Sequence, residues 1–215
     1  MSRLSFGALL FLALTAFQRA SIEAATVVNG SFEDPAVEFL LMGFDPGETI
    51  GTGWVVDGLS DSSSVVLFRS GALGAPVTND GGQFLLIGAG NPDFATIRQD
   101  LTLEAASYRL SFDLADGDGA APINAVNLDI TRSGQTIIGG PQNFSVGLSS
   151  GFETQELLFV APTAGDYRLI VSATAGTPGI DAFSVTEIAA VPEPCGFAAI
   201  SFAFIGLVLR RRTRT

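Results

Sequence analysis

The stretch Tyr108-Arg-Leu-Ser-Phe-Asp-Leu114 decides the fold of this chain. Large apolar side chains occupy every second position, at 108, 110, 112 and 114, and polar ones stand between them. The side chains of an extended strand point alternately to its two faces. The pattern therefore predicts a strand with one buried face and one face toward water.

Runs of the same kind recur along the chain, separated by Gly, Asn, Asp and Pro. The predicted strands are Val55–Val56, Ser64–Arg69, Gln83–Ile87, Ala95–Leu103, Tyr108–Ala115, Val126–Arg132, Thr136–Ile138, Phe152–Ala161, Tyr167–Ala173 and Ile180–Ile188. Turn signals return every eight to twelve residues or so, which favours a sandwich over an α/β fold. The sequence predicts one all-β domain over residues 26–190, a β-sandwich or jelly roll, which we call the ectodomain.

The sequence makes a specific prediction for two of the segments that connect the strands. Residues 39–53 contain scattered Gly, Pro and Asp, and we expect a loop with one short strand there. The segments Leu157–Val160 and Tyr167–Val171 flank the turn Thr163-Ala-Gly-Asp166, which predicts a β-hairpin.

Charge and composition exclude several classes of function. The net charge is −11, with no lysine in the chain, and so acidic a surface repels phosphate backbones and excludes nucleic acid as a partner. The chain has no histidine, and its single cysteine, Cys195, lies outside the ectodomain. Catalytic triads and His-ligated zinc are therefore excluded. A carboxylate pair, as in glycoside hydrolysis, is the enzymatic arrangement that remains.

The N-terminus has the layout of a signal peptide. A weakly basic start precedes the apolar run Leu4–Phe17, and small residues around Ala20–Ala25 offer a cleavage site. Residues 1–25 are predicted to direct export, so the ectodomain begins near Thr26, outside the cytoplasm.

The C-terminus combines three features in a fixed order. Val191-Pro192-Glu193-Pro194 is held extended by its prolines, the apolar run Cys195–Leu209 follows, and then come Arg210, Arg211 and Arg212. The run is shorter than the roughly 20 apolar residues of a full span, but arginines can snorkel to the interface and favour a cytoplasmic end. We expect a transmembrane helix over 195–209 with a basic stop over 210–215.

This tail resembles the PEP-CTERM sorting signal of bacterial surface proteins over residues 191–215. The resemblance implies recognition near Pro-Glu-Pro by an exosortase, a membrane-embedded protease or transpeptidase. It further implies a precursor anchored in the inner membrane, which after processing reaches the cell surface or the extracellular matrix of a biofilm-forming bacterium. Cys195 departs from the pattern, where a small polar residue is expected.

Two short motifs frame the ectodomain: Asn29-Gly-Ser-Phe-Glu33 opens it and Gly179-Ile-Asp-Ala-Phe-Ser-Val185 closes it. The first and last strands of a sandwich commonly lie near each other, so Glu33 and Asp181 could share one Ca²⁺ with backbone carbonyls. The alternative is that Glu33 caps a turn and Asp181 is solvated.

With Gly53-Trp54, these motifs resemble the galactose-binding-like jelly rolls, which include several families of carbohydrate-binding modules. The resemblance spans about residues 28–185. It implies a structural calcium held by Glu33 and Asp181. The family often has two acids in tandem in the closing motif, whereas here Ala182 follows Asp181.

Two further sequence features can each be interpreted in two ways. Trp54, the sole tryptophan, could be a sugar-stacking platform, but its setting in Gly-Trp-Val-Val favours the core. Asp113-x-x-Asp116-Gly-Asp118 resembles part of a calcium loop without its closing glutamate, and a polar hairpin turn is favoured. No ligand-binding residue for sugar is visible in the sequence.

Three functions remain open. The first is a non-catalytic, exported surface module that binds extracellular polysaccharide. The second is a structural matrix protein without a specific ligand. The third, and the least favoured, is a carboxylate-dependent glycoside hydrolase.

Overall fold

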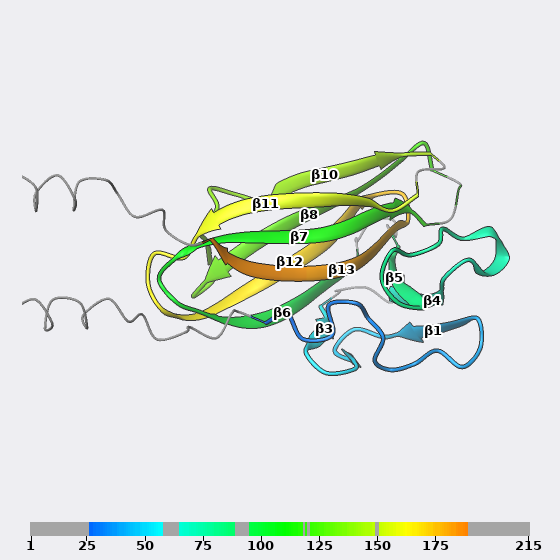
Figure 1. Cartoon of the computed structure of the whole chain (residues 1–215), viewed down its shortest axis with the longest axis horizontal. Helices are drawn as coiled ribbons and strands as arrows, with labels where there is room; N and C mark the ends of the chain where they lie inside the picture. The colour runs from blue at the N-terminus through cyan, green and yellow to red at the C-terminus, as the bar shows by residue number, and fades with distance from the viewer. Residues whose placement is uncertain are drawn as a thin grey trace, which may run out of the picture.

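Two antiparallel sheets packed face to face form the described part of the chain (Figure 1). The computed structural model describes residues 26–57, 65–88, 95–117, 119, 121–148 and 151–188. The first sheet runs in the order β1 (Leu41–Phe44), β4 (Val65–Arg69), β5 (Gln83–Ile87), β13 (Pro178–Ile188), β7 (Ser107–Asp116) and β11 (Glu153–Val160). The second runs β10 (Gln142–Gly147), β8 (Ile123–Arg132), β12 (Gly165–Ala175), β6 (Thr96–Leu103), β3 (Trp54–Val56) and β2 (Thr49–Ile50), with β9 (Gln135–Thr136) beside β8. The predicted all-β sandwich is confirmed.

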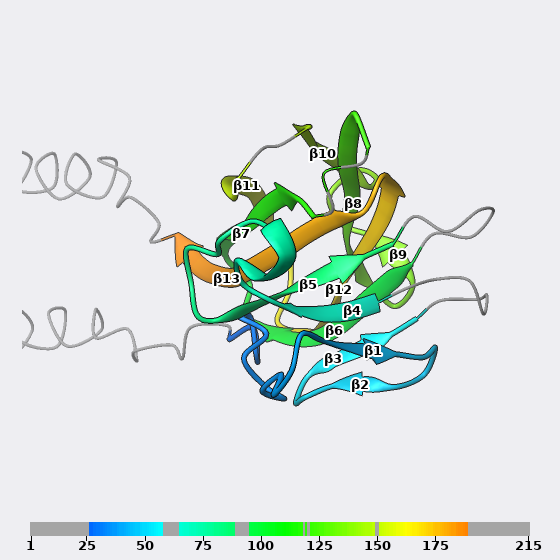
Figure 2. The same cartoon turned by 90° about the vertical axis from the view of Figure 1, so that its right-hand side faces the viewer.

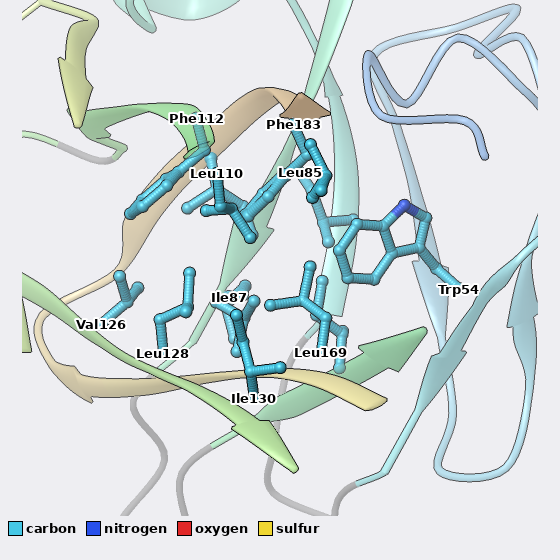
Figure 3. Packing of buried hydrophobic residues seen from close by; sticks show 14 of the residues in the cluster. Trp54, Leu85, Ile87, Leu110, Phe112, Val126, Leu128, Ile130, Leu169 and Phe183 are labelled. Atoms are coloured by element: carbon cyan, nitrogen blue, oxygen red, sulfur yellow. The ribbon is translucent and has the colours of Figure 1, made fainter. Parts of the chain in front are cut away.

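The core lies between the sheets and follows the alternation of the sequence. The side chains at 108, 110, 112 and 114 of β7 are at most 1% exposed, as the pattern predicts. Figure 3 shows Leu110 and Phe112 of the first sheet facing Val126 and Leu128 of the second. Each sheet therefore presents one apolar face inward and one face outward.

Strands that follow one another in the sequence commonly alternate between the sheets, as in a jelly roll. The hairpin predicted around Thr163 is wrong for this reason: β11 belongs to the first sheet and β12 to the second. The four residues between them cross the edge of the sandwich. The hydroxyl of Tyr167 donates to the carbonyl of Thr163, which fixes the crossing, and Tyr108 bonds Glu104 in the same way after β6.

The sequence missed two strands. Residues 39–53, expected to hold one short strand, hold two, β1 and β2, which lie in different sheets, so one residue range joins the edges of both layers. Strand β10 was also missed, since Phe144 and Val146 are the only apolar side chains in Gln142–Gly147.

The predicted signal peptide (1–25) and sorting tail (191–215) lie outside the described residues. Within the described ranges, no helix is long and apolar enough to cross a membrane. A short 3₁₀ turn, η1 (Ala72–Gly74), lies in the segment 70–82 that joins β4 to β5, which we call the 70–82 loop.

Candidate functional site

The opening and closing motifs of the ectodomain pack directly against each other. The amide of Phe183 donates to the carbonyl of Gly30 over 2.9 Å, and the indole nitrogen of Trp54 donates to the carbonyl of Asn29 over 3.1 Å. A Cβ on Gly30 would overlap the carbonyl oxygen of Phe183, so glycine is needed for this close approach. The expected meeting of the first and last segments is observed.

Aromatic rings pack together where the opening and closing motifs meet, and we call this cluster the aromatic junction. Phe32 and Phe183 lie 5.4 and 5.1 Å from Trp54 between ring centroids, and Phe112 stacks on Phe183 at 5.0 Å. Trp54 is fully buried, so its reading as a core residue is confirmed and the sugar-platform reading is wrong.

Asp181 is a buried carboxylate on the outer face of the first sheet. Its exposed fraction is 0%, and neither carboxylate oxygen has a hydrogen-bond partner in the described part of the chain. Burial raises the pKa of Asp181 to about 8; the nearby amide of Ala182 opposes the rise, and the charges of Asp80, Glu33 and Asp113 add to it. The expectation of a solvated Asp181 is wrong.

Glu33, the second predicted calcium ligand, is exposed, and its carboxylate already accepts hydrogen bonds from backbone amides. Its Oε1 accepts hydrogen bonds from the amides of Gly82 (2.8 Å) and Gln83 (3.1 Å) at the start of β5. It therefore caps the end of the 70–82 loop, while its charge still acts on Asp181. Glu33 and Asp181 therefore lie close enough for the charge of Glu33 to contribute to the raised pKa of Asp181.

The 70–82 loop folds over the outer face of the first sheet above Asp181. Figure 2 shows this segment passing in front of β7 and β13. Asn79 Nδ2 donates to Asp113 Oδ2 over 3.0 Å, and Asp113 lies opposite Asp181 in the register of β7 and β13. The loop is thus pinned at one point to Asp113 and at another to Glu33.

This neighbourhood meets part of what calcium requires. A buried carboxylate without a partner needs either a proton or a cation, and calcium takes six to eight oxygen ligands. Among the described residues, however, no three acidic side chains stand close enough together to hold a metal without help. Backbone carbonyls, water or a small approach of the loop would have to complete the shell.

The segment from Asp113 to Asp118, for which the sequence favoured a polar hairpin turn, does not form a hairpin. Asp116 is buried and its Oδ1 accepts hydrogen bonds from the amide of Gly119 and the side chain of Asn124, at 3.0 and 2.8 Å. It shapes the connection from β7 to β8, which crosses from one sheet to the other. Asp118 lies outside the described residues.

A separate hollow of about 690 Å³ lies on the outer face of the second sheet. Polar side chains of β6, β8 and β12 and of the adjoining loops line most of it, around Ile170; they include Asp57, Asp100, Thr131, Ser133, Asp166 and Arg168. We call this hollow the sheet groove. The described strands of this sheet turn no aromatic side chain outward, since their aromatic residues occupy the inward positions.

Side chains that line the sheet groove are paired with one another or with the neighbouring Arg98 and Thr102. Arg168 binds both carboxylate oxygens of Asp100, at 2.7 and 3.3 Å, and this pairing lowers the pKa of Asp100. Arg98 Nε lies 3.1 Å from Asp57 Oδ2, at an angle outside hydrogen-bond geometry. Thr102 donates to Asp166 over 3.1 Å. The groove therefore presents paired hydrogen-bonding groups, and each of its three carboxylates contacts a donor.

A smaller hollow of about 420 Å³ lies beside the 70–82 loop. Its walls are Phe68 and Leu86 of the first sheet, residues 72–76 of the loop, and the glycine backbone at 117, 119 and 151. The shape of this hollow thus depends on where the loop sits.

No protein-family model matches the chain, and no curated protein matches it. The chain is similar to several solved structures. TmCBM61, in complex with β-1,4-galactotriose, is 19% identical with a TM-score of 0.47, over 68% of this chain and 94% of that one. The K1 cleaved adhesin domain of Lys-gingipain from Porphyromonas gingivalis W83 is 12% identical with a TM-score of 0.46, over 70% and 99%. The carbohydrate-binding module CBM6cm-2 of Cellvibrio mixtus lichenase 5A, in complex with cellotriose, is 12% identical with a TM-score of 0.37, over 52% and 83%. At this distance, function has to be argued from the sites themselves.

Proposed function

We propose that this protein is a non-catalytic, exported module that binds a neutral extracellular polysaccharide along the sheet groove. The observation that carries the proposal is the groove itself, a hollow of about 690 Å³ lined by hydrogen-bond donors and acceptors. Its volume falls in the range of ligand sites, and hydroxyl groups pair well with carboxylates, guanidinium groups and threonine hydroxyls held in fixed positions. Because it spans several strands of an open sheet face, the groove suits a chain-like ligand.

The charges of the groove favour a neutral glycan over an acidic one. Among the described residues that line the groove, Arg168 is the one cation and is paired with Asp100, and the neighbouring Arg98 is paired with Asp57, so neither is free for sulfate or uronate groups. The chain as a whole carries a net charge of −11 and would repel a polyanion.

The carboxylates do not favour the hydrolase alternative. A general acid for glycoside hydrolysis needs a raised pKa and access to the substrate. In the sheet groove, Arg168 shifts the pKa of Asp100 downward. Asp181, with its raised pKa, is fully buried beneath the 70–82 loop, away from the groove.

Calcium and export complete the proposal. The unpartnered carboxylate of Asp181, with Glu33 beside it, supports a structural calcium that would neutralise this buried charge. The apolar and basic segments at the two ends of the chain support export, anchoring in the inner membrane, and release or attachment at the cell surface by an exosortase-type enzyme. A structural matrix protein with no ligand is the alternative function.

The test is a binding screen of the purified protein, with calcium present, against immobilised neutral and acidic polysaccharides. We expect saturable binding to a neutral polysaccharide, weakened roughly tenfold or more by Arg168→Ala, a loss of about 1.4 kcal/mol or more. The matched control is Arg109→Ala, which removes an arginine from the similarly exposed pair with Glu156 on the other sheet.

Each outcome bears on the proposal. Binding that Arg168→Ala reduces and Arg109→Ala leaves intact supports the sheet groove as the site. Binding that survives Arg168→Ala would move the site away from the groove. No binding to any polysaccharide would overturn the proposal in favour of the structural matrix protein.

A further inference from the structure

We infer that an exposed apolar corner of the first sheet rests on the lipid surface while the protein is anchored, and thereby turns the sheet groove away from the membrane. The corner consists of Leu158 and Val160 of β11 and Ile188 of β13. This inference rests on the membrane anchoring in the proposed function, and it adds the surface that touches the membrane and the orientation of the groove.

The strand register places the three side chains of the corner on one face. Val160 and Ile188 both lie opposite Ser107 of β7, and Leu158 lies opposite Arg109. Directly opposed residues of antiparallel strands point to the same face, and this is the outer face, because the alternate residues of β7 are buried. The exposed fractions are 62% for Leu158, 58% for Val160 and 37% for Ile188. The outer face of the first sheet therefore ends in an exposed apolar surface.

Charged groups border this corner without entering it. None of the six side chains in the two rows nearest the end of the sheet is acidic: Ser107, Arg109, Leu158, Val160, Thr186 and Ile188. Nε of Arg109 lies 3.6 Å from Oε2 of Glu156, which is further from the end. An arginine in this place can lay its carbon chain along an apolar layer and keep its guanidinium group among lipid headgroups.

The acids of the same end lie away from the corner. Glu104 directly follows β6 and Asp166 lies near the start of β12, and both of these strands belong to the second sheet. Glu187 alternates with Ile188 and therefore points to the other face of β13. This end of the sandwich is thus apolar on the side of the first sheet and acidic on the side of the second. A membrane with anionic lipids accepts the first side and repels the second.

The short connection to the expected anchor keeps this corner close to the membrane. Ile188 is the last residue of β13, and the apolar run expected to span the membrane begins at Cys195, seven positions later. Seven residues reach at most about 25 Å when fully extended. A tether of this length gives an effective concentration on the order of millimolar, so a small apolar surface is enough to hold the contact.

The contact determines which way the sheet groove faces. The corner is on the outer face of the first sheet, and the groove is on the outer face of the second. Figure 1 shows β11 and β13 ending at the same end of the sandwich. With this corner on the lipid, the first sheet leans toward the membrane and the groove opens away from it. An anchored protein would then present the groove to extracellular polysaccharide.

The test places an environment-sensitive fluorophore on single cysteines of the full chain, reconstituted in vesicles of phosphatidylethanolamine and phosphatidylglycerol. Cys195→Ser removes the native thiol, and flotation with the vesicles shows that this background is anchored. The labelled variants are Val160→Cys at the corner, Ser133→Cys in the groove at the same end, and Leu73→Cys beside the hollow at the opposite end. We expect only the label at position 160 to shift its emission to shorter wavelength and to be quenched by a spin-labelled lipid.

A second set of variants tests whether the apolar side chains cause the contact. Leu158→Ser together with Ile188→Ser removes the rest of the exposed corner and leaves the label at position 160 in place. This pair should abolish the quenching and leave flotation unchanged. The matched control is Leu148→Ser together with Val77→Ser, at positions that are 54% and 71% exposed and lie outside the corner, and it should change neither.

The outcomes separate this inference from the anchoring on which it rests. Quenching at position 160 that the serine pair abolishes supports the corner as the contact. A label at 160 that stays in water on a floating protein, or quenching that persists in the serine pair, overturns the inference and leaves the anchor intact. A shifted label that the spin-labelled lipid does not quench overturns it in favour of a protein cover, such as a second copy of the chain. A chain that does not float with the vesicles shows that the proposed anchoring is wrong, and the inference fails with it.

Discussion

Asp181 of β13 lies opposite Asp113 of β7 in the register of the first sheet, yet only Asp113 has hydrogen-bond partners. The two carboxylates share one face of the sheet and are both buried. Asp113 accepts from Thr154 and Asn79, which offset its lost hydration. Neither carboxylate oxygen of Asp181 has a partner in hydrogen-bond geometry among the described residues, and the register of β7 and β13 shifts directly after it. An unsolvated charge of this kind has to be matched by a proton or a cation.

The first prediction concerns the pH dependence of stability without calcium. The pKa of Asp181 rises from its ordinary 3.8 to about 8 on folding, so between these values the folded state holds a proton that the unfolded chain does not. This group therefore makes the fold less stable as pH rises from about 4 to 8, by at most about 1.4 kcal/mol per pH unit. The measurement is urea unfolding in chelator across that range, with the wild type compared with Asp181→Asn.

The comparison between the two proteins isolates this one group, because all other carboxylates titrate in both. We expect Asp181→Asn to become progressively more stable than the wild type as pH rises. Calcium should remove the difference by binding the charged form of Asp181. Parallel stability curves in chelator would show that Asp181 titrates as an ordinary solvated carboxyl.

The second prediction uses two glycines of the 70–82 loop. Gly81 and Gly74 both have positive φ, +77° and +85°, but only at Gly81 would a Cβ meet another residue, overlapping Oε1 of Glu33. Gly74→Ala should cost about 1–2 kcal/mol of unfolding free energy, from backbone strain alone. Gly81→Ala should cost roughly 1 kcal/mol more, because it also displaces the hydrogen bonds of Glu33. Equal losses in chemical denaturation would mean that Glu33 does not hold the loop.

The third prediction concerns the aromatic junction. Trp54→Ala removes a fully buried ring that contacts Phe32 and Phe183, and it should destabilise the fold by about 3–5 kcal/mol. Phe39→Ala, at a site that is 81% exposed, should change stability by no more than about 0.5 kcal/mol. Calorimetry of the two variants checks both values. A small loss for Trp54→Ala would mean that the junction contributes little to the core.

Alternation of apolar residues was enough to predict most of the strands and their buried faces. β7 illustrates this, since each apolar position of its pattern points into the core. The framing motifs could be paired because the first and last segments of a sandwich tend to be neighbours. Their positions at the two ends of the domain then suggested that Glu33 and Asp181 could meet.

What the sequence could not predict depends on contacts between distant segments. Asn79-Asp80-Gly81-Gly82 signals a turn, but nothing in these residues indicates that the turn lies over β13. The crossing between β11 and β12 has the turn composition of a hairpin, and only the packing of the sheets shows the difference. The sheet groove combines side chains from positions 57, 100, 131 and 168, which no local pattern joins.

The last prediction concerns the tail, residues 191–215. From the sequence we expect Pro194 to keep the segment before the apolar run extended, the conformation in which a membrane-embedded protease can bind a substrate. Pro194→Ala should therefore leave an unprocessed precursor in the membrane fraction, detected as a larger band by immunoblotting. Pro162→Ala, at an exposed proline of the ectodomain, is the matched control and should be processed normally. The control tests the loss of a proline without disturbing the fold, because Pro162 lies outside the core cluster of the sandwich. Normal processing of Pro194→Ala would show that the Pro-Glu-Pro segment is not the recognition site, whatever the ectodomain binds.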